Sequence, residues 1–417
     1  MTADPRRPTI VVVHGPGSAG PRDVLRAARG WADLVFLVNP DDSNGAADLP
    51  MLSRLARVVQ DRPDTDVLAE LRALAPVGIT TFGDARIARC AELAAGLGLP
   101  YHSRRTAELL SDKVRQRAAL NAAGVSPTRV EAAASTRELP AAAEKVGYPV
   151  VVKPASGNSS RWTGRYDDSA ALDALIRAAA ADPAAPACWI VEELLPAGRH
   201  PYGDVLADFV SVESVVEHGR ITHFAVTDRL ALAPPFRERG LLLPTLLAPD
   251  ETEPVLALAS AALAALDVRW GVTHTEIKLT PEGPRVIEVN GRLGGWVGEL
   301  MRRTATVDPV RVVLDVAAGR PADLGGLAFR AHAAVLLVQP PEGRFGVTEL
   351  ADPAVFRTEP GVWQVWRRAE PGDVVDSRSG SLQMLYAVYT ETDRAGMSGT
   401  LRRLDRIGRD AALLQPH

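Results

Sequence analysis

The sequence predicts an α/β N-terminal domain, an α+β central domain and a small α+β C-terminal module. Strand and helix patterns alternate over roughly the first hundred residues, which is typical of a parallel sheet. From Tyr148 onward, strand patterns follow one another with few helices between them, which favours a largely antiparallel sheet. Beyond Ala331, short strand patterns precede one final helix pattern. We therefore expect the chain to divide into domains at 1-106, 107-330 and 331-417.

The N-terminal elements are marked by β-branched runs and by residues that start or stop helices. Pro21 is tolerated in the first turn of a helix, and Gly98 follows the end of another helix. Ser111 is predicted to cap a further helix. The expected strands are Thr9–Val13, Leu34–Val38 and Gly78–Thr81, and the expected helices are Pro21–Trp31, Asp66–Ala75, Asp84–Gly96 and Asp112–Ala123.

The central and C-terminal regions are rich in strand-like segments. The expected central strands are Pro149–Lys153, Trp189–Glu193, Phe209–Val216, Ile221–Thr227, Thr273–Leu279 and Arg285–Asn290. The expected central helices are Leu139–Val146, Ala170–Ala181 and Glu253–Leu266. Near the C-terminus we expect strands at Ala333–Val338 and Gln383–Tyr389 and a final helix at Asp393–Leu414.

The composition excludes several classes of protein. The chain has 417 residues, and 47 Lys and Arg against 51 Asp and Glu give a net charge of −4, which offers no basic surface for nucleic acid. Its longest apolar run, Val255–Leu266, is shorter than the ~18 residues of a membrane helix, and the N-terminus has no signal-peptide core. Cys90 and Cys188 lack partner motifs, so we expect two buried, reduced thiols. These features predict a cytoplasmic protein that binds neither nucleic acid nor membrane.

Lysine is rare in this chain. Only 4 of the 47 basic residues are lysine, and the other 43 are arginine. An ammonium and a planar guanidinium are not interchangeable, so each lysine marks a candidate position that needs a compact ammonium. These residues are Lys113, Lys145, Lys153 and Lys278. Lys145 lies within a helix pattern and is expected at the surface.

A glycine-rich segment follows the first expected strand. Gly15, Gly17 and Gly20 have the spacing of a dinucleotide-binding loop. However, Pro16 has no N–H to offer a pyrophosphate, and no acidic residue stands at the end of the second strand, at Val38. We therefore interpret the segment as a tight strand-to-helix turn and rank an NAD(P)-binding protein last among the alternatives.

The most informative segment, residues 273–292, is predicted to form a β-hairpin. Two alternating strands flank a Pro-Glu-Gly turn, and we place the fold point at Glu282. Opposed residues of an antiparallel pair share a face, with Cβ atoms about 4.5–5.5 Å apart. The expected opposed pairs are Glu276 with Glu288, His274 with Asn290, and Lys278 with Val286. The residues expected to face a core on the other side are Ile277, Ile287 and Val289.

Two directly opposed carboxylates repel each other, so this face of the hairpin needs compensation. Lys278 would offset one charge. A divalent cation would offset both and would explain Asn290 as a neutral oxygen ligand. A small set of oxygen ligands suits Mg²⁺, which keeps waters and shares substrate phosphates. The alternative is a solvated polar face of the sheet.

A Glu on one strand, Glu-x-Asn on the next and then Arg292 with glycines resemble the metal- and phosphate-binding end of the ATP-grasp superfamily. The resemblance implies an ATP-grasp fold, in which two α+β subdomains clamp ATP and the lid subdomain covers residues 148-196. It also implies Glu276, Glu288 and Asn290 as ligands for Mg²⁺, with Mn²⁺ as the alternative ion.

Further segments match the superfamily in order along the chain. Lys113 and Lys153 match its two nucleotide-binding lysines, and the loop 156–161 is implied to close as a lid that excludes water. The match at 189–195 implies a hinge whose backbone binds adenine. The carboxylate that usually follows the hinge is missing, and Glu213 is assigned its ribose-binding role. The implied ATP-binding residues are Lys113, Lys153, Ser156, Gly157, Ser159, Glu192, Glu193, Leu194, Glu213 and Lys278.

Within the superfamily, the pattern from His274 to Lys278 is most similar to the L-amino-acid (dipeptide) ligase subgroup. The resemblance implies an ADP-forming ligase that activates a carboxylate as an acyl phosphate and then forms an amide with an amine. Arg292 would stabilise the oxyanions. His274 would orient a substrate or deprotonate the amine, with a structural histidine as the open alternative. The implied substrate-side residues are Arg229, Glu238, Gly294, Gly295 and Trp296.

One departure from the family and two alternative functions remain. The Asn-Pro-Arg that is frequent in the family is Asn290-Gly291-Arg292 here, which keeps the ligand and the cation but loosens the turn. The first alternative is a carboxylase-like or nucleotide-pathway enzyme that uses bicarbonate or formate, and the second is the NAD(P)-binding protein. The expected partners are small-molecule carboxylate and amine substrates, and a homodimer is compatible with the sequence.

Overall fold

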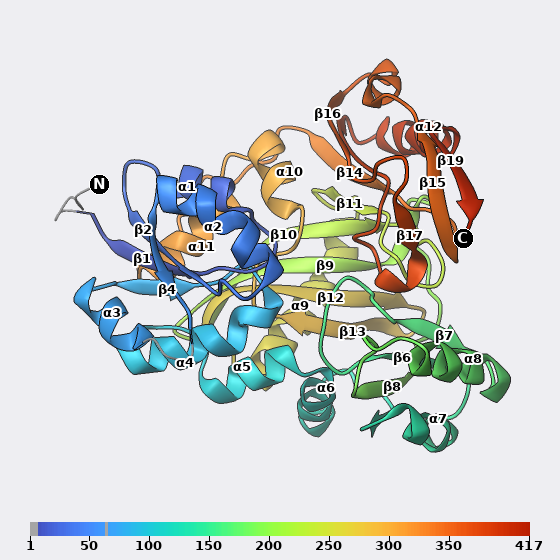
Figure 1. Ribbon diagram of the computed structural model, residues 1–417, viewed down its shortest axis with the longest axis horizontal. Coiled ribbons are helices and arrows are strands. Elements are labelled where there is room, and N and C mark those ends of the chain that lie inside the picture. The colour runs from blue at the N-terminus through green and yellow to red at the C-terminus, as the bar shows by residue number, and fades with distance from the viewer. Residues whose placement is uncertain (1–6, 63–65) are drawn as a thin grey trace.

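The computed structural model describes residues 7–62 and 66–417, and these form four sheets with helices packed on them (Figure 1). Residues 1–6 lie outside the described residues. They include part of the N-terminal segment that was expected to lack a signal-peptide core. No helix in the described ranges is long and apolar enough to cross a membrane.

The N-terminal sheet is parallel, with the strand order β3-β2-β1-β4. Its strands are β1 (Thr9–Val13), β2 (Asp33–Val38), β3 (Arg57–Gln60) and β4 (Gly78–Thr80), and its helices are α1 (Pro21–Ala28), α2 (Ser43–Leu55), α3 (Val67–Ala73) and α4 (Ile87–Leu97). This confirms the α/β class predicted for the region. The sequence analysis missed α2, which contains Pro50, and β3, a short edge strand.

A second, four-stranded sheet is antiparallel in the order β5-β8-β6-β7. Its strands are β5 (Val130–Ala133), β6 (Val150–Pro154), β7 (Gly164–Tyr166) and β8 (Trp189–Glu193), and its helices are α7 (Leu139–Val146) and α8 (Ser169–Ala180). Trp162 and Trp189 pack edge to face in its core, with ring centroids 6.1 Å apart. This green unit lies apart from the blue N-terminal sheet in Figure 1.

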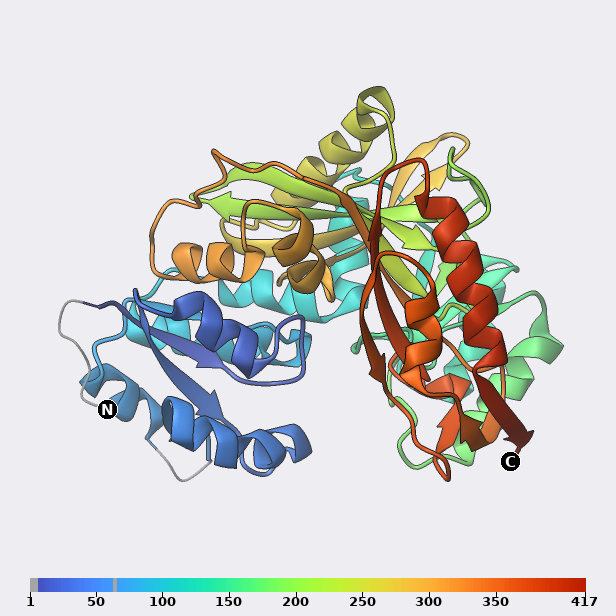
Figure 2. The same ribbon diagram turned by 90° about the horizontal axis from the view of Figure 1, so that it is seen from above.

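The largest sheet has eight strands in the order β13-β12-β9-β10-β11-β14-β18-β16, and every neighbouring pair is antiparallel. Its central strands are β9 (Leu206–Glu217), β10 (Arg220–Leu230), β11 (Gly240–Leu243), β12 (Trp270–Thr280) and β13 (Gly283–Asn290). The C-terminal part of the chain adds β14 (His332–Val338), β16 (Val362–Arg367) and β18 (Tyr386–Thr392). The C-terminal strands therefore extend the central sheet, as Figure 2 shows from above.

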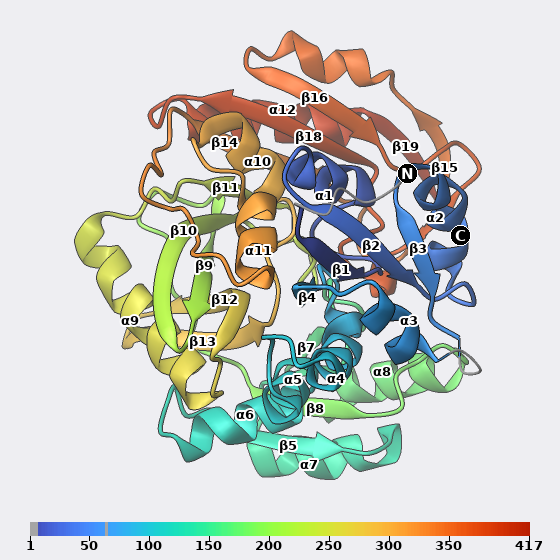
Figure 3. The same ribbon diagram turned by 90° about the vertical axis from the view of Figure 1, so that its left-hand side faces the viewer.

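Five helices connect the large sheet to its surroundings. They are α5 (Arg104–Ser111), α6 (Lys113–Ala122), α9 (Pro249–Ala265), α10 (Val297–Thr304) and α11 (Pro309–Ala317). The last two lie beside α1 and the N-terminal sheet (Figure 3). A Cβ on Gly78 of β4 would overlap the carbonyl oxygen of Ala317, so α11 packs on β4 at a distance that only glycine allows.

The C-terminal part also forms a three-stranded sheet, β17-β15-β19. Its elements are β15 (Arg344–Leu350), β17 (Val374–Asp376), β19 (Ala412–Pro416), α12 (Met397–Asp410) and the 3₁₀ helices η3 (Pro353–Thr358) and η4 (Ser377–Ser379). The helix predicted at Asp393–Leu414 is wrong at both ends. It begins after Gly396, and the residues after Asp410 pair with β15 instead.

The helix cap predicted at Ser111 is wrong by one residue. Ser111 ends α5, and the Asp112 carboxylate accepts hydrogen bonds from the N–H groups of Val114 and Arg115 at 2.9 and 3.1 Å. Asp112 satisfies two of the N–H groups that a helix start leaves unpaired. Lys113 is therefore the first residue of α6, beside the positive end of the helix.

The hairpin register is confirmed at its open end and wrong nearer the turn. His274 pairs with Asn290 and Glu276 with Glu288, but Lys278 lies opposite Arg285 instead of Val286. A β-bulge between Glu276 and Ile277 gives β13 one extra residue, Ile287. The Ile287 side chain consequently lines the cavity described below instead of facing the core, whereas Ile277 and Val289 are buried as expected.

Two single-residue expectations have opposite outcomes. The Lys145 side chain is 67% exposed, which confirms a surface position. Cys90 is buried, but Cys188 is exposed, so the expectation of a buried thiol at Cys188 is wrong. Cys188 lies directly before β8, where the chain leaves the alanine-rich loop after α8.

Leu263 of α9 packs fully buried against the large sheet, whereas Leu55 at the end of α2 is 48% exposed. The change Leu263→Ala leaves a cavity in the core, so we expect the free energy of unfolding to fall by about 2–5 kcal/mol. The change Leu55→Ala should alter it by less than about 0.5 kcal/mol. Urea unfolding followed by circular dichroism measures both, and equal losses would contradict the core position of Leu263.

Candidate functional site

A cavity of about 980 Å³ lies where the N-terminal domain, the second sheet, the large sheet and the C-terminal part meet. All but three of the predicted site residues line it, and the three exceptions are Glu213, Asn290 and Gly294. The predicted residues that line the cavity are Lys113, Lys153, Ser156, Gly157, Ser159, Glu192, Glu193, Leu194, Arg229, Glu238, His274, Glu276, Lys278, Glu288, Arg292, Gly295 and Trp296.

The opposed carboxylates form the most negative part of the cavity wall. Glu276 of β12 stands opposite Glu288 of β13, and the Lys113 ammonium lies 3.2 Å from Glu288. Burial raises the pKa of Glu288, but Lys113 and Lys153 outweigh it and hold that pKa at about 2. The Asn290 amide donates to Glu288 Oε1 at 3.2 Å. Glu288 is therefore an anion that is stabilised by Lys113 of α6, Lys153 of β6 and the Asn290 amide of β13.

This donor set is small and consists of oxygens. In the described ranges no group of three or more His, Cys, Asp or Glu side chains is placed to hold a metal ion. A metal here would depend on two carboxylates, the Asn290 amide and oxygens from outside the protein. That combination fits a hard cation which keeps waters and shares phosphate oxygens, as Mg²⁺ does.

A buried ion triad stands next to the carboxylate pair. Glu192 of β8 accepts from Lys153 at 2.6 Å and from Arg117 at 2.8 Å. Burial raises the pKa of Glu192, but the two cations lower it to about 2. Arg117 also donates to two carbonyls of β13, at 3.0 and 2.8 Å. The sequence analysis missed Arg117, although its position four residues after Lys113 on one helix face was a signal.

The loop 155–163 connects β6 to β7 and contributes Ser156, Gly157 and Ser159 to the cavity wall. Lys113 ties this loop to α6, because its amide donates to Ala155 O and its ammonium to Gly157 O, both at 2.8 Å. Gly157 has a φ of 128°, which favours glycine. The first lysine thus contacts both the carboxylate pair and the loop.

Arg292, which follows β13, pairs with an acid from the N-terminal domain. Its Nη2 lies 2.8 Å from Asp84 Oδ2 in η1 (Asp84–Arg86). Burial lowers the pKa of Arg292, but Asp84 outweighs burial and raises it. The sequence analysis missed Asp84. Its position just after β4, at the carboxyl edge of a parallel sheet, is where such sheets bind ligands and was the available signal.

His274 has three partners, none of which the sequence pattern revealed. Its Nδ1 lies against Glu213, and its Nε2 lies 2.8 Å from an Arg229 nitrogen and 3.4 Å from Glu276. Burial lowers the pKa of His274, but Glu213 and Glu276 outweigh burial and raise it to about 9. Arg229 also pairs with Glu238 at 3.1 Å. Both ring nitrogens of His274 are therefore engaged, and the imidazole is held in one orientation between β9 and β10.

Glu213, to which the ribose-binding role was assigned, lies behind His274 and does not line the cavity. Glu213 is completely buried, and its two oxygens accept from His274 and from the amide of Gly294, the latter at 2.9 Å. A Cβ on Gly294 would lie 2.5 Å from Glu213 Oε1. Glu213 therefore supports His274 from behind. The Gly294 amide, which was expected to contact the substrate, donates to Glu213 instead.

The hinge residues and Lys278 lie at the rim of the cavity. Glu193 pairs with Arg129 at 2.8 Å, and Lys278 pairs with Asp208 at 2.7 Å. The Leu194 amide donates to Pro149 O at 3.3 Å. Asp208 lies near the start of β9, so the Lys278 ammonium is held against that strand.

Aromatic residues close the other end of the cavity. The Trp296 ring lies 6.2 Å from that of Trp366 and 6.2 Å from that of Tyr389. Glu299, one turn later on α10, lines the same end, and burial raises its pKa to about 7. The lining residues that were not predicted include Asp84, Arg117, Glu299, Trp366, Arg368, Ser381 and Leu382. Four of these come from the C-terminal half of the large sheet or its loops, and only the fold brings them here.

The glycine-rich segment after β1 also lines the cavity, through Gly17, Ser18 and Gly20. A Cβ on Gly17 would overlap the carbonyl oxygen of Phe82, and the Ser18 amide donates to that oxygen at 2.9 Å. Gly17 therefore allows this turn to pack closely on the segment after β4.

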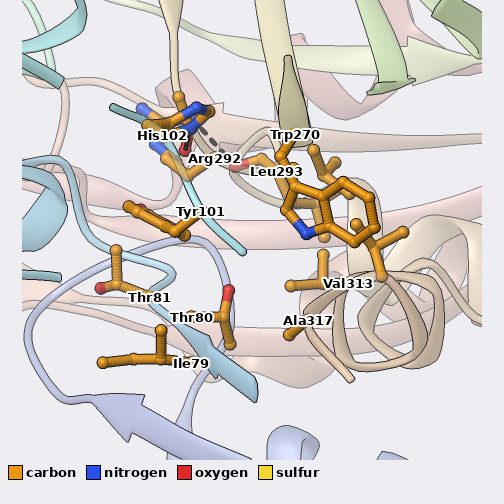
Figure 4. Close-up of a pocket in the computed structure, with 14 residues that line it drawn as sticks. Ile79, Thr80, Thr81, Tyr101, His102, Trp270, Arg292, Leu293, Val313 and Ala317 are labelled. Carbon is orange, nitrogen blue, oxygen red and sulfur yellow. Dashed lines mark hydrogen bonds between the residues drawn. The ribbon is translucent and has the colours of Figure 1, made fainter. Parts of the chain in front are cut away.

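A second, small cavity of about 20 Å³ adjoins Arg292 (Figure 4). His102 borders it and donates from Nε2 to Gly291 O at 3.3 Å. A Cβ on Gly291 would lie 3.0 Å from His102 Nε2 and 2.8 Å from Leu110 Cδ1. A side chain at position 291 would therefore crowd Leu110 and His102.

His102 makes unfolding dependent on pH. Burial lowers its pKa to about 4, and the group returns to its ordinary pKa of ~6.5 when the chain unfolds. Between these values the unfolded chain binds more protons, so the free energy of unfolding rises with pH by up to about 1.4 kcal/mol per unit. We expect His102→Gln to lose this part of the slope. Urea unfolding of both proteins from about pH 4 to about pH 7.5 measures it, and parallel curves would contradict a buried neutral imidazole.

Comparison with known proteins agrees with this geometry. The family model for the carbamoyl-phosphate synthase L chain, ATP binding domain, matches residues 112–239. The chain is 28% identical to alanine–anticapsin ligase of Bacillus subtilis strain 168, over 63% of the chain and 60% of that protein. It is 27% identical to carnosine synthase 1 of Mus musculus, over 70% of the chain and 38% of that protein. The chain thus spans less than two thirds of the length of these relatives.

The same architecture occurs in a solved structure. The crystal structure of L-amino acid ligase from Bacillus licheniformis superposes with a TM-score of 0.75 and 18% identity, covering 99% of this chain and 100% of that one. At this identity the likeness concerns the fold. The chain therefore has an ATP-grasp fold, and residues 112–239 within it match an ATP-binding domain.

Proposed function

We propose that the chain is an ATP- and Mg²⁺-dependent ligase that joins a carboxylate, taken to be an amino acid, to an amine. The products would be a dipeptide or amide, ADP and phosphate. One observation carries the proposal: the opposed carboxylates Glu276 and Glu288 share a cavity with Lys113, Lys153 and Arg292. The names of the relatives, an alanine–anticapsin ligase and a carnosine synthase, support it.

Glu276, Glu288 and Asn290 would hold Mg²⁺, with Mn²⁺ as the alternative ion. When bound, the ion supplies positive charge to the phosphate oxygens of ATP. The protein's part is to present the carboxylates on rigid neighbouring strands, which keeps their spacing constant.

The remaining residues of the cavity divide between ATP and the substrates. Lys113 and Lys153 would contact the α- and β-phosphates, and Glu192 would keep the Lys153 ammonium in place. The loop residues Ser156, Gly157 and Ser159 would cover the phosphates, and the backbone of Glu192, Glu193 and Leu194 would bind the adenine edge, with Lys278 at the rim.

The reaction would proceed through two displacements. A carboxylate oxygen attacks the γ-phosphorus of ATP and ADP leaves. The amine nitrogen then attacks the acyl carbon, phosphate leaves and the nitrogen loses a proton. Arg292 and the Gly295 amide would stabilise the oxyanions. Because both nitrogens of His274 are engaged, an orienting role suits it better than deprotonation of the amine.

The substrate side would consist of Arg229, Glu238 and Trp296, which line the cavity beyond Arg292. We retain the domains 1-106, 107-330 and 331-417, with the lid at 148-196, as part of the proposal. A homodimer is compatible with it.

The carboxylate pair provides the sharpest test. We expect Glu288→Ala to lower amino-acid-dependent ADP release by at least about a hundredfold, because it removes a ligand for the cation. Glu282→Ala alters an exposed carboxylate at the turn of the same hairpin and should leave the rate unchanged. ADP release is measured with Mg²⁺ and pairs of amino acids. Normal release by Glu288→Ala would sink the proposal, and release that needs bicarbonate would select the carboxylase-like alternative.

The scarcity of lysine suggests a second test. The Lys153 side chain is buried against Glu192, whereas that of Lys145 is exposed. A guanidinium is larger and planar, so we expect Lys153→Arg to raise the KM for ATP by about tenfold or more. Lys145→Arg should leave it unchanged. Steady-state kinetics with varied ATP measures both, and identical KM values would contradict the phosphate-binding role of Lys153.

A further inference from the structure

Three segments that are far apart in the sequence meet at Ser381, on the wall of the large cavity. The Ser381 amide donates to Ser159 O in the loop 155–163 at 2.8 Å. Its hydroxyl accepts from the amide of Glu238 at 2.8 Å, and its carbonyl accepts from Gln339 Nε2 at 2.8 Å. Ser381 is only 3% exposed. It therefore joins the phosphate-side loop directly to the substrate-side residue Glu238.

A second contact fastens the same loop to the same C-terminal segment. The Trp162 amide donates to Arg378 O at 3.0 Å, and the Arg378 guanidinium lies 5.6 Å from the centre of the Trp162 ring. Trp162 belongs to the core of the second sheet. The segment from Arg378 to Ser381 thus holds the loop at two points. Ser381 bonds to Ser159, and Arg378 bonds to Trp162.

The loop has an unfavourable backbone conformation at these points. Ser159, Ser160 and Trp162 have φ values of 58°, 56° and 54°, in the left-handed region that residues with a side chain avoid. Such a conformation is unfavourable for a residue with a side chain and persists only where its surroundings determine it. The hydrogen bonds to the segment from Arg378 to Ser381 provide such surroundings.

Gly380 makes the close approach possible. Its φ is 84°, and a Cβ there would overlap the carbonyl oxygen of Ser159 and lie 2.9 Å from Arg161 N. Any other residue at this position would push the loop away from the C-terminal segment. Gly372, in the same part of the chain, has a φ of 97° but open space around its missing Cβ.

We propose that Gly380 and Ser381 are positioning residues that latch the loop 155–163 over the phosphate end of the cavity and couple it to the substrate side. The coupling runs from Ser159 through Ser381 to Glu238, then to Arg229 and from there to His274 and Glu276. This inference rests on the proposed ligase function. A latched loop keeps water from the acyl phosphate, so ADP is released only together with amide.

The test compares Gly380→Ala with Gly372→Ala. Both changes place a Cβ on a glycine with positive φ, but only the first disturbs the loop. We expect Gly380→Ala to raise the ratio of ADP released to amide formed by about threefold or more. The reason is that water would enter the cavity and hydrolyse part of the acyl phosphate before the amine attacks it. Gly372→Ala should keep the wild-type ratio. Equal ratios in the two variants would overturn the proposal.

Hydrogen exchange gives a readout that does not need the reaction. The amides of 156–163 should exchange faster in Gly380→Ala than in Gly372→Ala, with circular dichroism showing that both remain folded. If Gly380→Ala does not fold, Ser381→Ala replaces it. That variant loses the hydrogen bond between the Ser381 hydroxyl and the Glu238 amide, which holds the latch on the substrate side, so both the product ratio and the loop exchange rate should rise.

The two proposals fail separately. A wild-type protein that releases no ADP with any pair of amino acids, yet shows faster loop exchange in Gly380→Ala, would refute the ligase function and leave the latch in place. Normal amide formation with unchanged product ratio and unchanged loop exchange in Gly380→Ala and Ser381→Ala would refute the latch alone.

Discussion

The opposed carboxylates of Glu276 and Glu288 are the constraint on which the rest of the cavity depends. Like charges facing each other across two strands are unfavourable, and the low dielectric of a partly enclosed site strengthens the repulsion. The fold answers with cations brought from other elements. Helix α6 supplies Lys113, 3.2 Å from Glu288, and β6 supplies Lys153, which lowers the pKa of Glu288 as well. The elements around the cavity thus place the positive charges of Lys113 and Lys153 next to the carboxylate pair.

The N-terminal domain takes part in this arrangement. Asp84 holds the guanidinium of Arg292, and His102 holds the peptide just before it, through Gly291. Both contacts reach the same turn from outside the large sheet. Because Asp84 contacts Arg292 and His102 contacts the peptide before it, the N-terminal part of the chain helps to shape the wall of the large cavity.

The sequence predicted what depends on local pattern and on charge. The facing of Glu276 and Glu288 follows from strand alternation, and the lysines were found because their chemistry is specific. The extra residue at Ile287 was missed because a period of two does not reveal a bulge. The burial of Glu213 behind His274 was not predicted, because alternation gives the face of a strand but not whether another side chain covers it. Ser381 was invisible because only the folded sheet brings it to Ser159.

The position of β14 has a consequence for how the protein is made. This strand lies inside the eight-stranded sheet, between β11 and β18, and it is the first of the three C-terminal strands β14, β16 and β18 to be synthesised. Until the ribosome has released this part, β11 presents an unpaired edge of backbone groups, which is a site for mispairing with other chains. The central region therefore cannot complete its sheet until the C-terminal strands are available to pair with β11.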